Sequence, residues 1–249
     1  MVRFYSTDYT YAYPFPAVSL AYFLRYPNPY SRHVASTDTI SRAFDPATQR
    51  LTTVRLHVKR SRLPPAVVKL LPKSTFTGGG GDGKSTQSFI LERSVVDARQ
   101  GWMECESWNL DWDNVLSVIE KHTYTRPAAL SSTAGGVEAD RTDVSVSVTL
   151  KSRIGEQLRK RRQRWGEQAT ASSVSGSSNG EEESVAKPGW FSSWSSGAIR
   201  SAIESISLQR TEKSQPKAQK GMSVVLSRLR NGGIQEVLEG MRKDRELEI

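Results

Sequence analysis

Residues 25–34 read Arg-Tyr-Pro-Asn-Pro-Tyr-Ser-Arg-His-Val and separate two segments of different pattern. Before them, Phe15 to Tyr26 has apolar residues at helical spacing, so we expect a helix that Pro27 ends. After them, His33 to Phe44 and Leu51 to Arg60 predict a β-hairpin. The Pro-Asn-Pro turn is therefore expected to join a helix to the beginning of a sheet.

The other segments predict further strands and one long helix. Strand-like runs are expected on both sides of the hairpin: Phe4 to Tyr13, Gln87 to Val96, Gly101 to Leu110, Val115 to Thr125 and Asp143 to Leu150. The helix is expected from Trp194 to Leu229, kinked or broken by Pro216 and ended by Gly232 and Gly233. This order is typical of an α+β fold with antiparallel pairing, in which the final helix can pack across one face of the sheet and enclose a cavity.

Composition limits the classes of protein that the chain can belong to. Its 35 basic and 26 acidic residues give a net charge of +9, which favours a polyanionic partner such as nucleic acid, an anionic membrane or a phosphorylated ligand. Hydrophobic content is low at 37%, and the Ser-, Gly- and Glu-rich stretch Gly166 to Lys187 is expected to be disordered. A single cysteine, Cys105, excludes an intrachain disulfide, and with three histidines it argues against a zinc cage.

No targeting or membrane-spanning segment is evident. The uncharged run from Tyr9 to Leu24 is interrupted by Pro14 and Pro16, and it lacks the basic start of a signal peptide. No run reaches the ~20 apolar residues that a membrane span needs. We therefore expect a soluble chain without a cleaved leader.

A phosphate-loop pattern occurs at Gly78 to Ser85, which read Gly-Gly-Gly-Gly-Asp-Gly-Lys-Ser. In a nucleotide-binding site this loop follows a strand and opens a helix, whose N-terminus receives the phosphates. Here Pro72 to Thr75 precede it and the strand-like Ser88 to Leu91 follow it. We therefore interpret the tract as a glycine-rich hairpin loop rather than a nucleotide site.

Two other features leave alternatives open. The basic run Arg159 to Arg164, within a helix-like piece from Ile154 to Trp165, fits a nuclear-localisation or nucleic-acid patch, an anionic membrane contact or a solvated basic segment. The aromatic cluster Trp190 to Trp194 fits either a membrane–water boundary or an anchor of the final helix on the sheet. No catalytic constellation is recognisable, since His33, His57 and His122 lie far apart and no Gly-x-Ser-x-Gly motif occurs.

Alternation along the second hairpin strand places Arg55, His57 and Lys59 on one face. From the pattern alone, this basic face is expected to be solvated. On the preceding strand the face shared with His33 carries only small side chains, which leave room for a packed helix or a ligand: Ala35, Thr37, Thr39 and Ser41.

The stretch at 25–34 resembles the signature of the PRELI/MSF1 family, which are phospholipid-transfer proteins of the mitochondrial intermembrane space. The resemblance covers roughly residues 2–153 and 190–232. It is supported by further matches at Asp38 to Arg42, Thr52 to Leu56, Leu63-Pro64, Ser94 to Asp97, Asn109 to Asp111, Phe191 to Ser193 and Gly221 to Leu226. The Tyr-Pro-Asn-Pro-Tyr-Ser form is similar to the branch that transfers phosphatidic acid rather than the one that transfers phosphatidylserine.

The resemblance implies one α+β domain over residues 1–232, with flexible insertions at 74–86 and 154–189 and a charged tail at 233–249. A curved antiparallel sheet of about seven strands and a long C-terminal helix would enclose a lipid cavity, as in StAR-related and phosphatidylinositol-transfer proteins. By matching position, the headgroup-binding residues are Arg25, His33, Arg55, Lys59, Arg62, Arg210, Ser214 and Lys217. Arg25 and His33 would share a phosphate site, and the basic face of the hairpin would then point into the cavity.

The segment Leu63 to Pro72 matches the family's mobile lid. Its expected membrane contacts are Leu63, Val67, Val68, Lys69, Leu70 and Leu71. A lid of this kind would cover the cavity when closed and touch the membrane when open. Its lysine would favour anionic lipid.

The implied function is non-enzymatic transfer of phosphatidic acid from the outer to the inner mitochondrial membrane, which supports cardiolipin synthesis. A buried phosphate monoester requires basic donors, and exposing acyl chains to water costs about 0.8 kcal/mol per methylene. Expected partners are anionic membranes and a small twin Cx9C helical-hairpin protein in the intermembrane space. No cofactor, metal or nucleic acid is expected. The alternatives are phosphatidylserine transfer and a membrane-bound scaffold or regulator that extracts no lipid.

Overall fold

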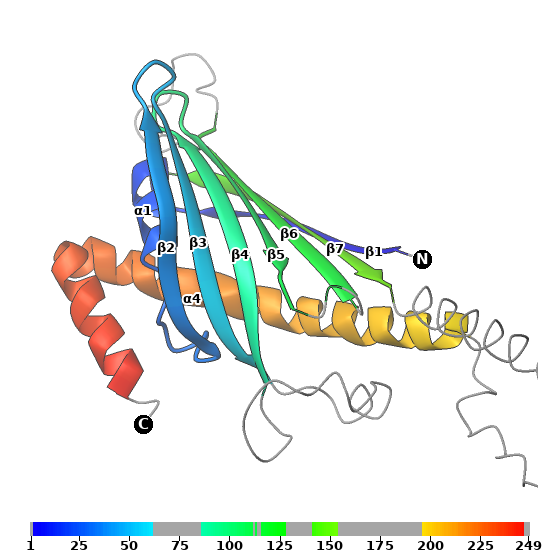
Figure 1. Ribbon diagram of the computed structural model, residues 1–249. Helices are drawn as coiled ribbons and strands as arrows, with labels where there is room; N and C mark the ends of the chain where they lie inside the picture. Colours follow the sequence, from blue (N-terminus) through cyan, green and yellow to red (C-terminus); the bar gives the residue numbers. More distant parts are fainter. Residues whose placement is uncertain are drawn as a thin grey trace, which may run out of the picture.

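In the part of the chain that the structure describes, a curved antiparallel sheet packs with the helices α1 and α4 (Figure 1). The computed structural model describes residues 2–61, 86–111, 113, 116–127, 141–153 and 196–246. The elements are β1 (Val2–Tyr11), α1 (Phe15–Phe23), β2 (Val34–Asp45), β3 (Arg50–Ser61), β4 (Thr86–Asp97), β5 (Trp102–Asn109), β6 (Leu116–Thr125), β7 (Thr142–Ser152) and α4 (Ser196–Glu246). This confirms the α+β class and the antiparallel sheet with a C-terminal helix.

The strand order is β1-β7-β6-β5-β4-β3-β2, and every neighbouring pair is antiparallel. Strands β1 and β2 therefore lie at opposite edges, although only α1 and the turn at 24–33 separate them in sequence. From β2 onward the chain returns strand by strand until β7 pairs with β1. Helix α1 consequently lies with α4 against one face of the sheet (Figure 1).

The core lies between this face and the two helices. On β7, Val144, Val146, Val148 and Leu150 are all buried, as the period-two pattern predicts. They belong to one apolar cluster with Phe15, Val18 and Tyr22 of α1 and with Met222, Val225 and Leu226 of α4. Burial of these side chains is the main term that holds the helices on the sheet.

Helix α1 ends at Phe23, three residues before the predicted end at Tyr26. Tyr26 precedes a proline and so disfavours helical geometry. The Arg25 side chain also turns back, and its Nη1 donates to the carbonyl of Tyr22 at 2.8 Å. The early end frees Arg25 to point toward the sheet.

Helix α4 runs through Pro216 without a break, contrary to the predicted interruption there. Its backbone leaves helical geometry at Gly232 and Gly233, where the sequence predicts that the helix ends, and Gly233 has a positive φ of 65° that glycine tolerates. The chain then folds back as a second helical stretch, over part of the predicted charged tail (Figure 1). Val237 is fully buried there, and Arg228 donates to Asp244 at 2.7 Å.

Within the described ranges, no helix is long and apolar enough to cross a membrane. Several predictions lie outside these ranges: the lid, the glycine tract, the basic run, the aromatic cluster, and the insertions apart from Thr86, which begins β4. Because β4 begins directly after Ser85, a strand rather than a helix follows the phosphate-loop pattern. This is what we expected of a glycine-rich loop that is not a nucleotide site.

Candidate anion-binding cavity

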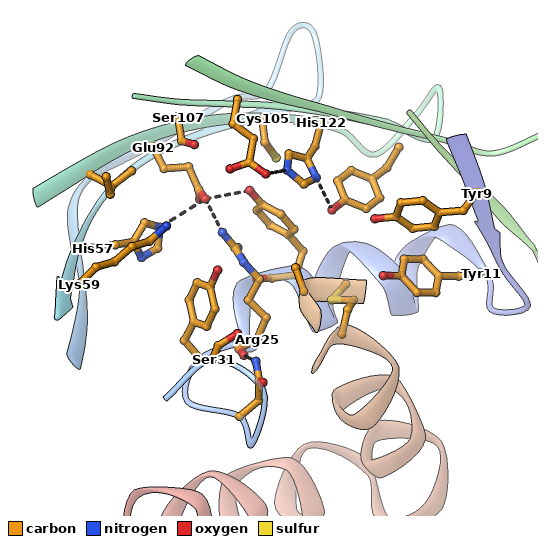
Figure 2. Close-up of a pocket in the computed structure, with 18 residues that line it drawn as sticks. Tyr9, Tyr11, Arg25, Ser31, His57, Lys59, Glu92, Cys105, Ser107 and His122 are labelled. Atoms are coloured by element: carbon orange, nitrogen blue, oxygen red, sulfur yellow. Dashed lines mark hydrogen bonds and ion pairs between the residues drawn. The ribbon is translucent and has the colours of Figure 1, made fainter. Parts of the chain in front are cut away.

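A polar cavity of about 60 Å³ lies between the sheet, α1 and α4 (Figure 2). Its walls combine tyrosines with charged groups: Tyr9, Tyr11, Tyr22, Arg25, Tyr26, Asn28, Ser31, His57, Lys59, Ile90, Glu92, Cys105, Ser107, Glu120, His122, Tyr124, Ala218 and Met222. The residues come from α1, the following turn, five strands and α4, so only the completed fold assembles this site.

Glu92 of β4 is the centre of a buried ion cluster (Figure 2). Its Oε1 accepts from Nε of Arg55 at 2.9 Å and from Nη2 of the same side chain. Its Oε2 accepts from the Tyr22 hydroxyl at 2.8 Å and from Nη2 of Arg25. The side chains of Glu92 and Arg55 are only 2% and 3% exposed, whereas Arg25 is 14% exposed. Removing one partner from such a buried pair typically costs about 3–5 kcal/mol.

The surroundings hold Glu92 in its charged form. Burial alone would raise the pKa of its carboxyl, but Arg25, His57 and Arg55 together lower this pKa well below its usual range. His57 Nδ1 lies 2.9 Å from the Thr37 hydroxyl, and its Nε2 lies 3.3 Å from Glu92 Oε2 without hydrogen-bond geometry. Burial lowers the pKa of His57, so its ring is neutral near pH 7. Two arginines and one carboxylate therefore leave this cluster with one surplus positive charge.

The basic face of β3 is thus buried at Arg55 and His57, contrary to the solvated face that the pattern alone predicts. The partner Glu92 supplies the reason, because an ion pair with several hydrogen bonds offsets the cost of burying a charge. Two bulges in β2, between Val34 and Ser36 and between Thr39 and Ser41, also interrupt the continuous small-residue face that we predicted for that strand.

A second network connects the sheet to α4. Glu120 of β6 accepts a hydrogen bond from Nε2 of Gln215 at 2.7 Å and lies 2.8 Å from Nε2 of His122. Burial would raise the pKa of Glu120, but His122, Lys59 and Gln215 lower it to about 2. Ala218 and Met222 of α4 line the cavity, and Gln215 reaches its wall through the bond to Glu120. The ionised Glu120 therefore fixes the cavity-facing side of α4 to the sheet.

Three of the predicted headgroup residues gather near the C-terminal end of β3. Partial burial and the cations of Lys59 and Lys217 lower the pKa of His33 to about 4, although this residue remains largely solvent-exposed. The backbone N–H of Arg60 donates to the carbonyl of His33 at 2.7 Å and fixes the turn on β3. Lys59 lines the cavity, and no described carboxylate lies within ion-pair distance of its ammonium group.

The Pro-Asn-Pro turn owes its shape to the buried Asn28. The Asn28 amide donates to the carbonyl of Arg25 at 2.6 Å, and its Oδ1 accepts from the backbone N–H of Tyr30 at 2.9 Å. Gly221 of α4 packs directly on this amide, since a Cβ there would meet Asn28 Oδ1 at 2.6 Å. Asn28 therefore positions both Arg25 and the closing helix.

The remaining predicted residues lie apart from the cavity wall. Arg210 and Ser214 lie on the same exposed face of α4 as Lys217, and the Ser214 hydroxyl donates to the carbonyl of Thr211 at 3.1 Å. Arg55 stands behind the wall rather than in its lining. Arg62 and the lid residues Leu63, Val67, Val68, Lys69, Leu70 and Leu71 lie outside the described residues.

Sequence reasoning missed the two cavity carboxylates, Glu92 and Glu120. Each belongs to a strand whose other inward positions carry no carboxylate: Ile90, Ser94 and Val96 in β4, and Val118, His122 and Tyr124 in β6. A carboxylate at an inward position of a strand requires a buried cation beside it. The place of Glu92 and Glu120 in the period-two pattern was therefore the signal by which they could have been found.

The family follows from comparison with known proteins. A model of the PRELI-like family matches residues 16–165, which is more than half of the chain, so the chain belongs to this family. Similar relatives include "Protein UPS1, mitochondrial" of Saccharomyces cerevisiae, 38% identical over 133 residues, which are 53% of this chain and 69% of that protein. The "Protein ups1 homolog" of Schizosaccharomyces pombe is 43% identical over 103 residues, 41% of this chain and 53% of that protein.

A human relative, "PRELI domain-containing protein 1, mitochondrial", is 29% identical over 124 residues, 50% of this chain and 52% of that protein. The chain thus spans about half the length of the human and fission-yeast proteins. Among solved structures, Ara h 8.0201 gives a TM-score of 0.38 at 13% identity and covers 91% of this chain and 99% of its own. The Zhui aromatase/cyclase from a Streptomyces species gives 0.40 at 11% identity, over 94% and 100% of the two chains.

Proposed function

We propose that this chain carries phosphatidic acid between the outer and inner mitochondrial membranes without converting it, and thereby supports cardiolipin synthesis. The observation that carries the proposal is the enclosed cavity in which Arg25 and Lys59 present positive charge beneath α4. A phosphate monoester needs such donors when it leaves water. Membership of the PRELI-like family and relatives named as mitochondrial support the location.

In this proposal Lys59 and Arg25 contact the phosphate, Lys217 attracts it by its charge, and the neutral His33 ring offers it a hydrogen bond beside these lysines. Arg210 and Ser214 extend the same face of α4, and the family resemblance assigns Arg62 to the headgroup and the lid segment from Leu63 to membrane contact. A twin Cx9C partner in the intermembrane space holds the chain in its folded form. No covalent step is needed, because the cavity only has to replace water around the headgroup and the acyl chains.

The test is transfer of fluorescently labelled phosphatidic acid between donor and acceptor liposomes, with the twin Cx9C partner co-expressed. We expect transfer by the wild-type chain, and Lys59→Glu should slow it at least tenfold because the ligand meets a like charge. Arg60→Glu is the matched control, since it makes the same charge change at the adjacent exposed position. No transfer by the wild type would overturn the proposal, and equal transfer by both variants would favour a scaffold. Competition with phosphatidylserine liposomes separates the two headgroups.

A further inference from the structure

The structure assigns a function to Glu92 that rests on the proposed function and extends it. We propose that the Glu92 carboxylate is an internal anion that holds the Arg25 guanidinium until a phosphate-bearing lipid displaces it. The exchange between carboxylate and phosphate would then set how readily the cavity releases its cargo. Glu92 is, in this sense, a residue that tunes affinity rather than one that binds the ligand.

The two arginines on Glu92 differ in their access to the cavity. Arg25 lines it and is 14% exposed, whereas Arg55 is absent from the lining and 3% exposed. An anion that enters therefore meets a guanidinium whose Nη2 is already bonded to Glu92 and whose Nη1 is bonded to the Tyr22 carbonyl. Since carboxylate and phosphate both suit guanidinium donors, the two anions compete for Arg25.

The carboxylate can release Arg25 without losing its compensation. Oε1 keeps both N–H donors of Arg55, and Oε2 keeps the Tyr22 hydroxyl when Arg25 turns away. Arg55 thus anchors Glu92, and Arg25 is the exchangeable partner. A buried carboxylate left without any cation would be too costly, so this division between the arginines makes the exchange feasible.

The arrangement suits a carrier, which must bind its cargo and also release it. A cavity with two unopposed arginines would hold a phosphate tightly, because charge-assisted hydrogen bonds in a buried site are strong. With Glu92 present, part of that attraction is already satisfied in the empty protein. The free energy of lipid binding is therefore less favourable by the part of the attraction that Glu92 already satisfies.

The test compares three full-length variants by isothermal titration with two probes, inorganic phosphate and a water-soluble short-chain phosphatidic acid. Glu92→Gln should bind about tenfold tighter, which corresponds to one charge-assisted hydrogen bond released for the ligand. Arg55→Lys should bind about threefold weaker, because a less well anchored Glu92 depends more on Arg25. Glu120→Gln is the control, since it removes a cavity carboxylate that touches neither arginine, and its gain should be clearly smaller.

Tighter binding of both probes by Glu92→Gln supports exchange at the phosphate group, and tighter binding of short-chain phosphatidic acid alone supports exchange with the lipid only. Equal gains in Glu92→Gln and Glu120→Gln would overturn the inference, because net charge would then explain both. If Glu92→Gln does not fold, Arg55→Lys decides, and unchanged or tighter binding overturns the inference. Absence of binding by both the wild type and Glu92→Gln overturns the inference, whereas the transfer assay with labelled phosphatidic acid tests the proposed function separately.

Discussion

His33 shows how neighbouring charges control a single side chain at the mouth of the cavity. Partial burial, Lys59 and Lys217 lower its pKa from 6.5 to about 4, so the ring is neutral at pH 7. Both lysines disfavour the imidazolium form by repulsion. An anion that binds between them cancels this repulsion, so anion binding and protonation of His33 should favour each other.

We predict that Lys217→Gln raises the pKa of His33 toward 6.5, because one of the two repelling cations is removed. The measurement is an NMR titration of the imidazole C–H shifts between pH 3 and 8. Lys220→Gln serves as the control, since it removes a cation from the same helix that does not contribute to this shift. The same rise in both variants would show that the total charge of α4, and not Lys217, determines the pKa of His33.

The position of helix α4 depends on close packing at Gly221 as well as on the burial of its apolar face. A Cβ at this position would meet the Asn28 side chain at 2.6 Å, and Asn28 is itself fixed by hydrogen bonds to Arg25 and Tyr30. The helix and the Pro-Asn-Pro turn therefore fit only if residue 221 has no side chain.

Gly221→Ala should lower the free energy of unfolding by roughly 1–2 kcal/mol. Overpacking costs about 1–3 kcal/mol, and the higher helix propensity of alanine offsets part of it. Urea denaturation followed by circular dichroism measures the change. A double-mutant cycle with Asn28→Ala provides the control, because the cost of Gly221→Ala should largely disappear once the amide is absent. Additive costs would mean that the two residues do not clash.

The elements that the sequence predicts well are those specified by local pattern. The period-two valines of β7 mark the inward face of that strand directly, whereas α1 is apolar on nearly every side and only its helical character follows from the pattern. The burial of Arg55 was not predictable in this way, because its partner Glu92 lies 37 residues away and pairs with it only after β3 and β4 align. Only the family resemblance, which reflects the whole fold, predicted that the basic face of β3 points inward.

At Pro216 the prediction from local propensity is wrong. Local propensity predicts an interruption there, yet Gln215 beside it is bonded to Glu120 and the apolar residues Met222, Val225 and Leu226 pack on the sheet. These tertiary contacts outweigh the single backbone hydrogen bond that proline removes. The predicted end at Gly232 and Gly233 is confirmed, since the helix breaks there, the chain reverses and Val237 returns to the core.

The size of the cavity bears on how the entire domain works. About 60 Å³ holds only a few water molecules, whereas a diacyl lipid must bury tens of methylenes at about 0.8 kcal/mol each. A domain that carries such a lipid therefore has to widen, and we expect the sheet and α4 to separate. The Gln215–Glu120 hydrogen bond joins α4 to β6 of the sheet, and the Asn28–Gly221 contact joins α4 to the turn that follows α1.

We predict that covalently joining α4 to β6 blocks lipid transfer while leaving membrane binding intact. Gln215→Cys and Glu120→Cys, in a Cys105→Ser background, can be connected by a short cleavable thiol linker, since the native side chains touch at 2.7 Å. Transfer of labelled phosphatidic acid should fall to the background rate after linking and return after reduction, which also controls for the loss of Glu120. Liposome flotation measures membrane binding in parallel. Full transfer by the linked protein would show that lipid enters without separation of α4 from the sheet, and the opening would then have to lie elsewhere in the domain.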